Sequence, residues 1–375
     1  MFGASGFTGR LTAEALGARL AGGAARWAIA GRRRAPLDAL ADEIERSGGS
    51  RPGVRIADVG DPSSLRALAA STRVLATTVG PYARFGEPVV EAAIAEGCDY
   101  ADITGEPEFV GRVLERHDAA ARAAGVRIVN CCGFDSVPHD LGALLAVRAL
   151  GSEAPIDLEG FVRGRGEVSG GTWRSALEAL ADPAATRRAM RRIEPTPGRR
   201  LSMGARRPKR ERRLGGRWVA PLPTIDPWIV LRSAAALPEY GPHFRYGHYV
   251  QVGSTPKLLI GGASLSALAV GARVPPVRTL LLRWRTSGEG PNAETRARSR
   301  FEVRFFGTSA GRQVEVEVSG GDPGYGETSK MLAESALSLA YDDLPARTGV
   351  LTPAVALGDA LIERLRAGGL VLRVV

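Results

Sequence analysis

Three glycines at the start of the chain constrain its fold more than any other stretch. Gly3, Gly6 and Gly9 stand three residues apart, and an apolar pattern of helical spacing follows them over residues 11–20. This order predicts a strand-to-helix turn around a pyrophosphate. Gly3 permits the turn, Gly6 lets the backbone approach the phosphates, and Gly9 lets the helix pack on a sheet. The N–H groups at the positive end of that helix then face the anion. The expected contact residues are Gly3, Ser5, Gly6, Phe7, Thr8 and Gly9.

The strand that should lead into this turn is almost missing. Only Met1 and Phe2 precede Gly3, whereas strands usually run about 5–6 residues, and in a doubly wound sheet this strand is central. We therefore expect a truncated first strand. We also expect that the natural chain begins several residues upstream, with Met1 a misassigned start.

Apolar strand patterns alternate with helical patterns along the first third of the chain. Counting the truncated strand before Gly3 as the first, the second to sixth strand patterns cover residues 27–30, 54–57, 73–79, 99–104 and 126–132. The helical patterns cover residues 9–21, 36–46, 88–96 and 108–124, and a further helix opens at Asp61. Such a rhythm indicates a parallel sheet with helices on both faces. We predict an α/β fold in which residues 1–145 form a Rossmann-type doubly wound parallel sheet.

The rhythm breaks after the sixth strand pattern. Alternating residues at 301–306 and 313–318 are typical of an antiparallel pair of strands. We therefore expect residues 146–348 to form a second, α+β substrate domain with a basic loop at 187–213. Residues 349–375 contain the last helical pattern, which we expect to pack back on the Rossmann domain.

The positive charge of the chain is concentrated in the basic loop. Residues 187–213 hold twelve Arg or Lys and two acids, which accounts for the whole net charge of +10 and leaves the rest neutral. A neutral body argues against a general nucleic-acid binder, and we expect no nucleic-acid partner. The segment is either a solvated loop or a site for an anionic partner: an acidic carrier protein, a membrane surface or a phosphate-bearing substrate.

The most apolar run covers residues 258–274 and carries no charge before Arg273. Its length is at the lower limit for a membrane span, and its glycines weaken that interpretation. We expect a buried or interfacial segment, with a lipid-contacting surface element and a true span as alternatives. Because the N-terminus lacks the pattern of a signal peptide, we expect a cytoplasmic protein, with peripheral attachment to the plasma membrane left open.

Cysteine and histidine spacing gives no further site. The three cysteines, which include the neighbours Cys131 and Cys132, form no disulfide framework, and we expect buried free thiols. No Cys/His cluster in the sequence has metal-ligand spacing. We therefore expect no metal.

The end of the second strand pattern indicates which dinucleotide binds. An NAD site places an acid there for the ribose hydroxyls, whereas a 2′-phosphate is met by an arginine. The chain has no acid between Gly31 and Asp38, and three arginines follow Gly31. We therefore predict NADPH/NADP+, with Arg32 on the 2′-phosphate or stacked on the adenine. Asp58, which ends the third strand pattern, is expected to accept from the adenine amino group or to cap the next helix.

Three further strand ends carry glycine, hydroxyl and acid residues. They are residues 77–82, 104–106 and 133–136. Because ligands bind at the carboxyl ends of parallel strands, we expect all three in one cleft with the glycine turn. The residues expected under the ribose and nicotinamide of the cofactor are Thr78, Val79, Gly80 and Pro81.

Six segments together resemble the saccharopine dehydrogenase-like oxidoreductases, particularly the trans-acting enoyl reductases of mycobacteria and related bacteria. They are residues 3–11 (GASGFTGRL), 30–32 (AGR), 77–82 (TTVGPY), 100–106 (YADITGE), 132–140 (CGFDSVPHD) and 349–359 (GVLTPAVALGD). The resemblance implies a Rossmann domain, NADP(H) and a second domain that shapes the substrate pocket. It also implies an acyl chain on a polyketide synthase as substrate, reduced in trans during glycolipid synthesis.

The resemblance leads to a hypothesis for the chemistry. NADPH would deliver a hydride to the β-carbon of an enoyl thioester, and the enzyme would stabilise the enolate oxygen and protonate the α-carbon. We predict Tyr82 as the proton donor, with Asp135 or His139 as alternatives. The structural alternative for Tyr82 is packing against the nicotinamide.

Rival functions stay open at this point. The chain could reduce an imine or amino-acid substrate, as saccharopine-forming enzymes do, or it could be a non-catalytic NADP-binding protein at a lipid surface. The expected partners are a small-molecule or carrier-bound acyl substrate, with an acidic acyl carrier or a membrane surface at 187–213 and 258–274. A homodimer also stays open.

Overall fold

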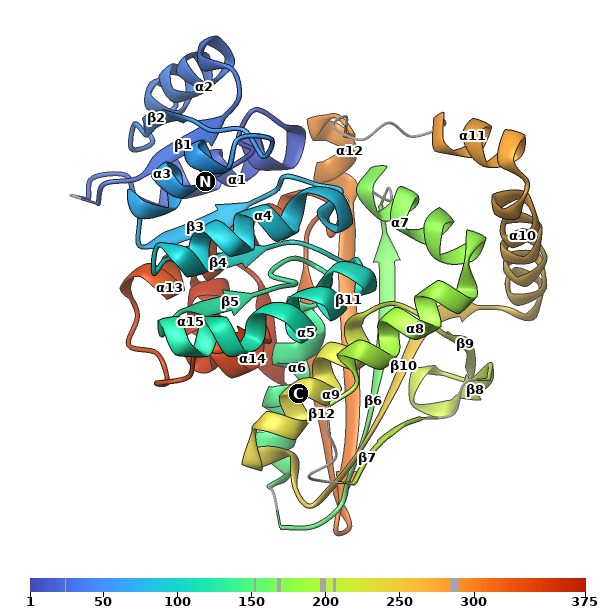
Figure 1. The fold of residues 1–375 in the computed structure, drawn as a ribbon. Helices are drawn as coiled ribbons and strands as arrows, with labels where there is room; N and C mark the ends of the chain where they lie inside the picture. The colour runs from blue at the N-terminus through green and yellow to red at the C-terminus, as the bar shows by residue number, and fades with distance from the viewer. Residues whose placement is uncertain (24, 152, 167–169, 196–199, 205–206, 284–289) are drawn as a thin grey trace.

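The computed structural model describes residues 1–375 apart from 24, 152, 167–169, 196–199, 205–206 and 284–289 (Figure 1). Two β-sheets organise the described chain. The paired strands of the first sheet are all parallel. These strands are β1 (Ala28–Gly31), β2 (Gly53–Ile56), β3 (Val74–Thr77), β4 (Asp99–Asp102), β5 (Arg127–Val129) and β13 (Gly349–Leu351).

Residues Met1 to Gly3 join the two halves of this sheet. Phe2 forms parallel bridges to Ala30 of β1 and to Thr77 of β3. Its N–H donates to the Ala76 carbonyl (2.8 Å), and its own carbonyl accepts from the Thr78 N–H (3.1 Å). The strand order is therefore β2, β1, Phe2, β3, β4, β5, β13, which is the doubly wound Rossmann order. The predicted truncated first strand is reduced to a single bridging residue.

Helices cover both faces of the first sheet. α3, α4 and α5 pack in a row on one face, and α1 packs between α2 and α13 on the other. Apolar spacing sets the buried side, as in α2, where Leu37, Leu40 and Ile44 are buried. The helix bounds are α1 (Phe7–Arg19), α2 (Arg34–Arg46), α3 (Pro62–Ala70), α4 (Tyr82–Ala95), α5 (Pro107–Ala124) and α13 (Gly326–Tyr341).

The second sheet is mixed and has the order β14, β12, β11, β6, β10, β9, β8, with β7 paired to β10. The predicted antiparallel pair is confirmed, since β11 and β12 pair from Phe301 with Gly320 to Ser309 with Arg312. The predicted α/β fold with a second α+β domain is thereby confirmed. The strands are β6 (Ile156–Arg165), β7 (Arg200–Met203), β8 (Lys209–Glu211), β9 (Arg217–Pro221), β10 (His243–Gly253), β11 (Arg300–Ser309), β12 (Arg312–Gly320) and β14 (Val371–Val374).

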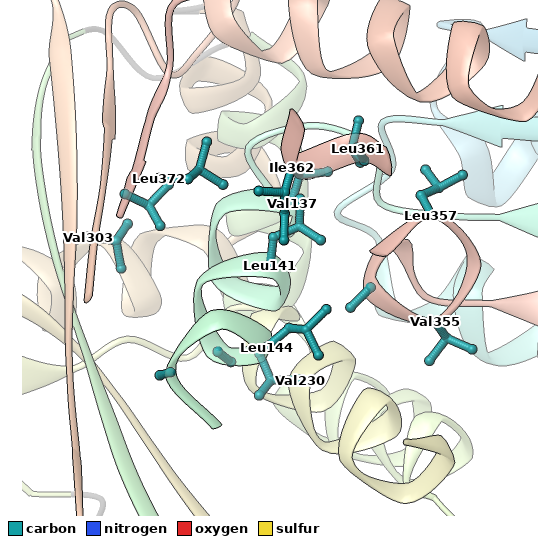
Figure 2. Close-up of a cluster of buried hydrophobic side chains, with 14 of the residues drawn as sticks. Val137, Leu141, Leu144, Val230, Val303, Val355, Leu357, Leu361, Ile362 and Leu372 are labelled. Atoms are coloured by element: carbon teal, nitrogen blue, oxygen red, sulfur yellow. The ribbon is translucent and has the colours of Figure 1, made fainter. Parts of the chain in front are cut away.

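Helix α6 (Val137–Leu150) connects the two sheets through one core. In Figure 2, Leu141 and Leu144 lie among side chains of other elements, including Val230 of α9 (Asp226–Ala236) and Ile362 of α15 (Gly358–Ala367). The same buried cluster reaches strands β3 and β5 of the first sheet and strands β11 and β12 of the second. Gly142 permits this packing, because a Cβ there would lie 2.3 Å from the Phe305 ring.

The C-terminal segment serves both sheets. β13 extends the first sheet beside β5, whereas β14 pairs with β12 in the second. Between them, α14 (Pro353–Ala356) packs on α6, and α15 packs on α13 and α6. Residues 349–375 therefore hold more than the single expected helix.

Residues 187–213, which we expected to form a loop, are largely regular in the part that the structure describes. They contain the end of α8 (Pro183–Ile193), β7, β8 and the start of the 3₁₀ turn η1 (Arg212–Leu214). Lys209 Nζ lies 2.6 Å from Glu159 Oε1 of β6, and Arg213 Nη2 lies 2.5 Å from Glu159 Oε2. The loop prediction was wrong because the strands use charged side chains that are paired across the sheet. Arg199 and Arg206 lie outside the described residues.

The apolar run folds as α10 (Thr255–Arg273), followed by α11 (Pro275–Arg283), at the edge of the molecule far from α2 (Figure 1). Only Ala272 of α10 is buried, and Leu259 and Ile260 are 68% and 66% exposed. We expected a buried or interfacial segment here, and the prediction of a buried segment is therefore wrong. Within the described chain, α10 is long and apolar enough to cross a membrane by length and composition. The remaining helices are α7 (Gly170–Ala181), α12 (Ala293–Arg298) and the 3₁₀ turn η2 (Pro238–Tyr240).

Candidate functional site

The glycine turn has the geometry that anion binding needs. Gly3 has φ +86°, and the Gly6 N–H donates to the Gly3 carbonyl (3.0 Å). Gly6 is the N-cap of α1, and no side chain caps this helix end. A Cβ at Gly9 would lie 2.1 Å from the Gly3 carbonyl oxygen. The first-turn N–H groups of α1 are thus left for a ligand, and the backbone is packed too closely for any side chain at Gly9.

The other turn residues contact both domains. Ser5 Oγ lies 3.5 Å from the position of a Cβ on Gly31, at the end of β1. The Phe7 ring packs edge-to-face on Tyr325 (4.8 Å between centroids), and the Arg296 guanidinium lies 5.5 Å from the ring centroid. The backbone around Thr8 is held as well, since its carbonyl accepts from Ser329 Oγ (3.3 Å). Residues from the second half of the chain therefore fix the turn.

The predicted adenosine-side residues lie at neighbouring strand ends. Arg32 directly follows β1, is exposed, and forms no ion pair within the described part of the chain. Asp58 follows β2, and its Oδ1 accepts from the Gly60 N–H (2.9 Å). The cap of α3 is Asp61 instead, whose carboxylate accepts from the Ser63 N–H. The structure therefore rules out the helix-capping role that was the alternative for Asp58.

The loop after β3 packs against the glycine turn. Thr78 Oγ1 lies 3.5 Å from the Gly3 carbonyl oxygen, and a Cβ on Gly3 would lie 2.8 Å from Val79 Cγ2. Gly80 and Pro81 then lead into α4. The predicted cofactor residues therefore gather along the carboxyl edge of β1, Phe2 and β3, where a dinucleotide binds in this topology.

Tyr82 is the first residue of α4, and its side chain is buried against the ends of β3 and β4. Its buried hydroxyl donates to the Thr77 carbonyl (3.0 Å) and accepts from the Ile103 N–H (3.4 Å), and its ring stacks on Phe109 (5.7 Å). Burial raises the pKa of this hydroxyl well above its usual value. These contacts favour a packing role, although against Phe109 rather than against a nicotinamide. The Glu106 carboxylate accepts from the Tyr82 N–H (2.9 Å), which explains why α4 begins there and not at residue 88.

A buried carboxylate orders the loops after β4 and β5. Asp102 accepts from the Tyr100 hydroxyl (2.9 Å), Asn130 Nδ2 (2.7 Å) and two backbone N–H groups, those of Thr104 (3.0 Å) and Cys131 (3.1 Å). Burial raises the pKa of this carboxyl to about 6. The network positions the loop that carries Asp135.

Asp135 lies at the edge of the first sheet beside the loop after β4. A Cβ on Gly105 would lie 2.9 Å from Asp135 Oδ2, so the two strand-end loops touch at a glycine. Burial, together with the like charge of Asp226, raises the pKa of Asp135 to about 7. A carboxyl that retains a proton near neutral pH can serve as a general acid.

His139 meets two residues of the second domain that sequence reasoning missed. Its Nε2 lies 3.8 Å from Asp226 Oδ2, and the Nε2 of His248 lies 3.5 Å from the same oxygen. Burial lowers the pKa of His139 to about 4. Burial alone would raise the pKa of Asp226, but the two histidines outweigh it and hold it below the usual range. Asp226 and His248 lie far from His139 in the sequence, and Asp226 followed by Pro227 has the pattern of an ordinary helix start. No local signal therefore pointed to them.

Comparisons with known proteins identify the relatives of this chain. Residues 1–129 match the family described as the saccharopine dehydrogenase NADP binding domain. The chain is 39% identical over 406 residues to a Mycobacterium tuberculosis (H37Rv) protein provisionally named a trans-acting enoyl reductase, covering 100% of this chain and 96% of the relative. It is 33% identical over 405 residues to the trans-acting enoyl reductase of Mycobacterium leprae, covering 99% and 96%.

A solved structure shares the fold of both domains. The apo saccharopine dehydrogenase (L-Glu forming) of Saccharomyces cerevisiae aligns with a TM-score of 0.53 and 15% identity, over 97% of this chain and 98% of that chain. At this identity the likeness concerns the fold.

Proposed function

Because this chain belongs to the saccharopine dehydrogenase-like family of trans-acting enoyl reductases and is an NADP-dependent oxidoreductase, we propose that it reduces the double bond of an enoyl thioester. The proposed substrate is an unsaturated acyl or polyketide chain on a carrier, in lipid or glycolipid synthesis. The observation that carries this proposal is the similarity to the enoyl reductases over both domains, and not only over the dinucleotide-binding part.

The chain supplies a cofactor site of the required type. The uncapped start of α1 would hold the pyrophosphate, because its N–H groups have no side-chain cap. Gly9 keeps the turn tight, since a Cβ there would collide with the Gly3 carbonyl oxygen. Arg32 would meet the 2′-phosphate, since its guanidinium is exposed at the end of β1. NADPH, when bound, supplies the hydride for the reduction.

The remaining chemistry is a proton transfer to the substrate, and Asp135 suits it better than the other two candidates. Asp135 lies at the strand-end edge and holds its proton to about pH 7, because its pKa is raised to that value. His139, with a pKa of about 4, is unprotonated at neutral pH. The Tyr82 hydroxyl is already bonded to two backbone groups, at the end of β3 and just after β4. We therefore assign the proton donor first to Asp135.

A substrate panel separates the proposed function from its rivals. NADPH oxidation is measured with enoyl thioesters, imines and 2-oxo acids, for the unaltered enzyme and for Asp135→Asn. We expect turnover with enoyl thioesters only, and a loss of about 100-fold or more in kcat for Asp135→Asn with NADPH binding retained. Oxidation with imines alone would establish the amino-acid-type reductase. NADPH binding without oxidation by any of these substrates would establish the non-catalytic alternative.

The partner that we propose is a lipid surface at α10 and α11, with the protein otherwise in the cytoplasm. These helices expose Leu259, Ile260, Leu265, Val270 and Leu280. Basic residues lie on the same two helices: Lys257, Arg273, Arg278 and Arg283. Exposed apolar helices flanked by cations suit the interface of an anionic membrane, where a lipid substrate is also found.

A further inference from the structure

We propose that His139, Asp226 and His248 form a zinc site at the junction of the two domains. The three side chains come from three elements: the first turn of α6, the first residue of α9, and β10. All are buried, with exposures of 1%, 1% and 6%. One ligand atom from each lies within 4.8 Å of the other two. This inference is independent of the proposed substrate.

The spacing of the donor atoms is close to that of a metal centre. Zinc bonds of about 2.0–2.1 Å in a tetrahedron hold neighbouring donor atoms roughly 3.4 Å apart. Asp226 Oδ2 lies 3.5 Å from His248 Nε2 and 3.8 Å from His139 Nε2. The first distance matches a metal-bridged pair, and the second needs a shift of a few tenths of an ångström.

Four buried polar atoms in this cluster lack hydrogen-bond partners among the described residues. They are Nδ1 and Nε2 of His139, Nε2 of His248 and Oδ1 of Asp226. Leaving a polar group buried and unpaired is costly. A cation bound between the two Nε2 atoms and the Asp226 carboxylate would give both Nε2 atoms a partner at once.

Neighbouring groups orient the ligands as they do in metal sites. The Tyr246 hydroxyl lies 3.2 Å from His248 Nδ1, which leaves His248 Nε2 directed at the carboxylate. The Thr224 hydroxyl donates to Asp226 Oδ2 (2.5 Å). The His139 ring packs edge-to-face on His248 (4.9 Å) and on Phe134 (5.4 Å). Such outer contacts fix ring orientation and tautomer in metal centres.

The donor set selects the metal class. Two imidazoles and one carboxylate suit Zn²⁺, and because the same donor set also binds Fe²⁺, elemental analysis distinguishes the two metals. A second group of three, Glu87, Glu91 and His117, offers no comparable site, because Arg112 and Arg116 already pair with Glu87 (both 3.1 Å). That surface group supplies a matched control.

Metal analysis of the full chain, free of any histidine tag, tests the proposal. We expect about one zinc per chain by elemental analysis. After removal by a chelator, Co²⁺ should restore the visible absorption of a tetrahedral site, and Zn²⁺ should raise the unfolding temperature. A chain that holds no zinc and gives no such Co²⁺ spectrum while folded, as judged by circular dichroism, would overturn the site.

Variants locate the metal within the chain. His248→Gln keeps the size of the side chain and should weaken Zn²⁺ binding about 100-fold or more, whereas His117→Ala should leave it unchanged. If His248→Gln does not fold, Thr224→Val tests the same site, because loss of an orienting partner should weaken binding about 10–100-fold. Unchanged zinc affinity in a folded His248→Gln or Thr224→Val variant would refute the assignment.

Discussion

At the scale of single residues, the predicted dinucleotide site depends on glycines at which the backbone leaves no room for a side chain. Gly9 is the sharpest case, since a Cβ there would lie 2.1 Å from a backbone oxygen that cannot rotate away. We expect Gly9→Ala to weaken NADPH binding at least tenfold in a fluorescence titration. Gly53→Ala is the control, because a Cβ at Gly53 meets its nearest atom at 3.7 Å. Equal affinities for the two variants would contradict the turn as the pyrophosphate site.

We predict that Arg32 governs the choice between NADPH and NADH. Its guanidinium is exposed after Gly31 and is free to meet a 2′-phosphate. A charge-assisted hydrogen bond contributes about 1.5–3 kcal/mol, so Arg32→Ala should weaken NADPH binding by roughly tenfold or more and leave NADH binding unchanged. Arg34→Ala serves as the comparison, because Arg34 already faces Asp38 (3.8 Å). A loss shared equally by NADH and NADPH would exclude the 2′-phosphate as the contact.

At the scale of elements, α10 leaves its apolar side chains in water. Burying a leucine or isoleucine side chain contributes about 1.5–3 kcal/mol. The double variant Leu259→Gln, Ile260→Gln should therefore reduce sedimentation with anionic phospholipid vesicles by tenfold or more. Ile56→Gln, 45% exposed on β2, should behave like the unaltered protein. Sedimentation that persists in the double variant would exclude α10 as the contact.

The ion pairs of Glu211, at the end of β8, should make the stability of the protein depend on pH. Hydrogen bonds from Arg213 lower the pKa of Glu211 to about 2, below the ordinary value of about 4.3. The carboxylate therefore stabilises the fold fully above pH 4.3, and this contribution is lost as the pH falls toward 2.

Urea unfolding of Glu211→Gln checks this. We expect the variant to be less stable by about 1–2 kcal/mol at pH 7, after allowance for solvent screening, with the difference shrinking between pH 4.3 and 3. Glu294→Gln, whose exposed partner is Arg298, should show little difference at either pH. A gap for Glu211→Gln that stays constant with pH would rule out the ion pairing as its source.

At the scale of the whole molecule, the sequence predicted what local periodicity controls. Gly3 to Gly9 and the alternation of strands and helices were sufficient for the parallel sheet, because each signal lies within a few residues. The pairing of Lys209 and Arg213 with Glu159 could not be predicted, because strands are recognised in a sequence by alternating apolar residues and these positions are charged. The exposure of α10 was hidden for a related reason: an apolar helix has the same sequence whether a core or solvent surrounds it.

The candidate site divides in the same way into a part that local sequence patterns predict and a part that depends on long-range packing. Its cofactor half lies at strand ends that the glycine pattern locates, so those residues could be proposed from the sequence. Asp226 and His248 reach His139 only because α9 packs against both α6 and β10, which no local pattern encodes. Tyr82 shows the converse, because its position at a strand end predicts access to a ligand, whereas its hydroxyl turns into the sheet.

The shared core predicts that both domains unfold together. Leu141 is fully buried in α6, within the cluster that contains residues of both sheets (Figure 2). Leu141→Ala should destabilise the protein by about 2–5 kcal/mol and shift one calorimetric transition as a whole. Leu280→Ala, 68% exposed on α11, should leave the transition in place. Two separate transitions, of which Leu141→Ala moves only one, would mean that α6 belongs to a single domain and that the core does not couple them.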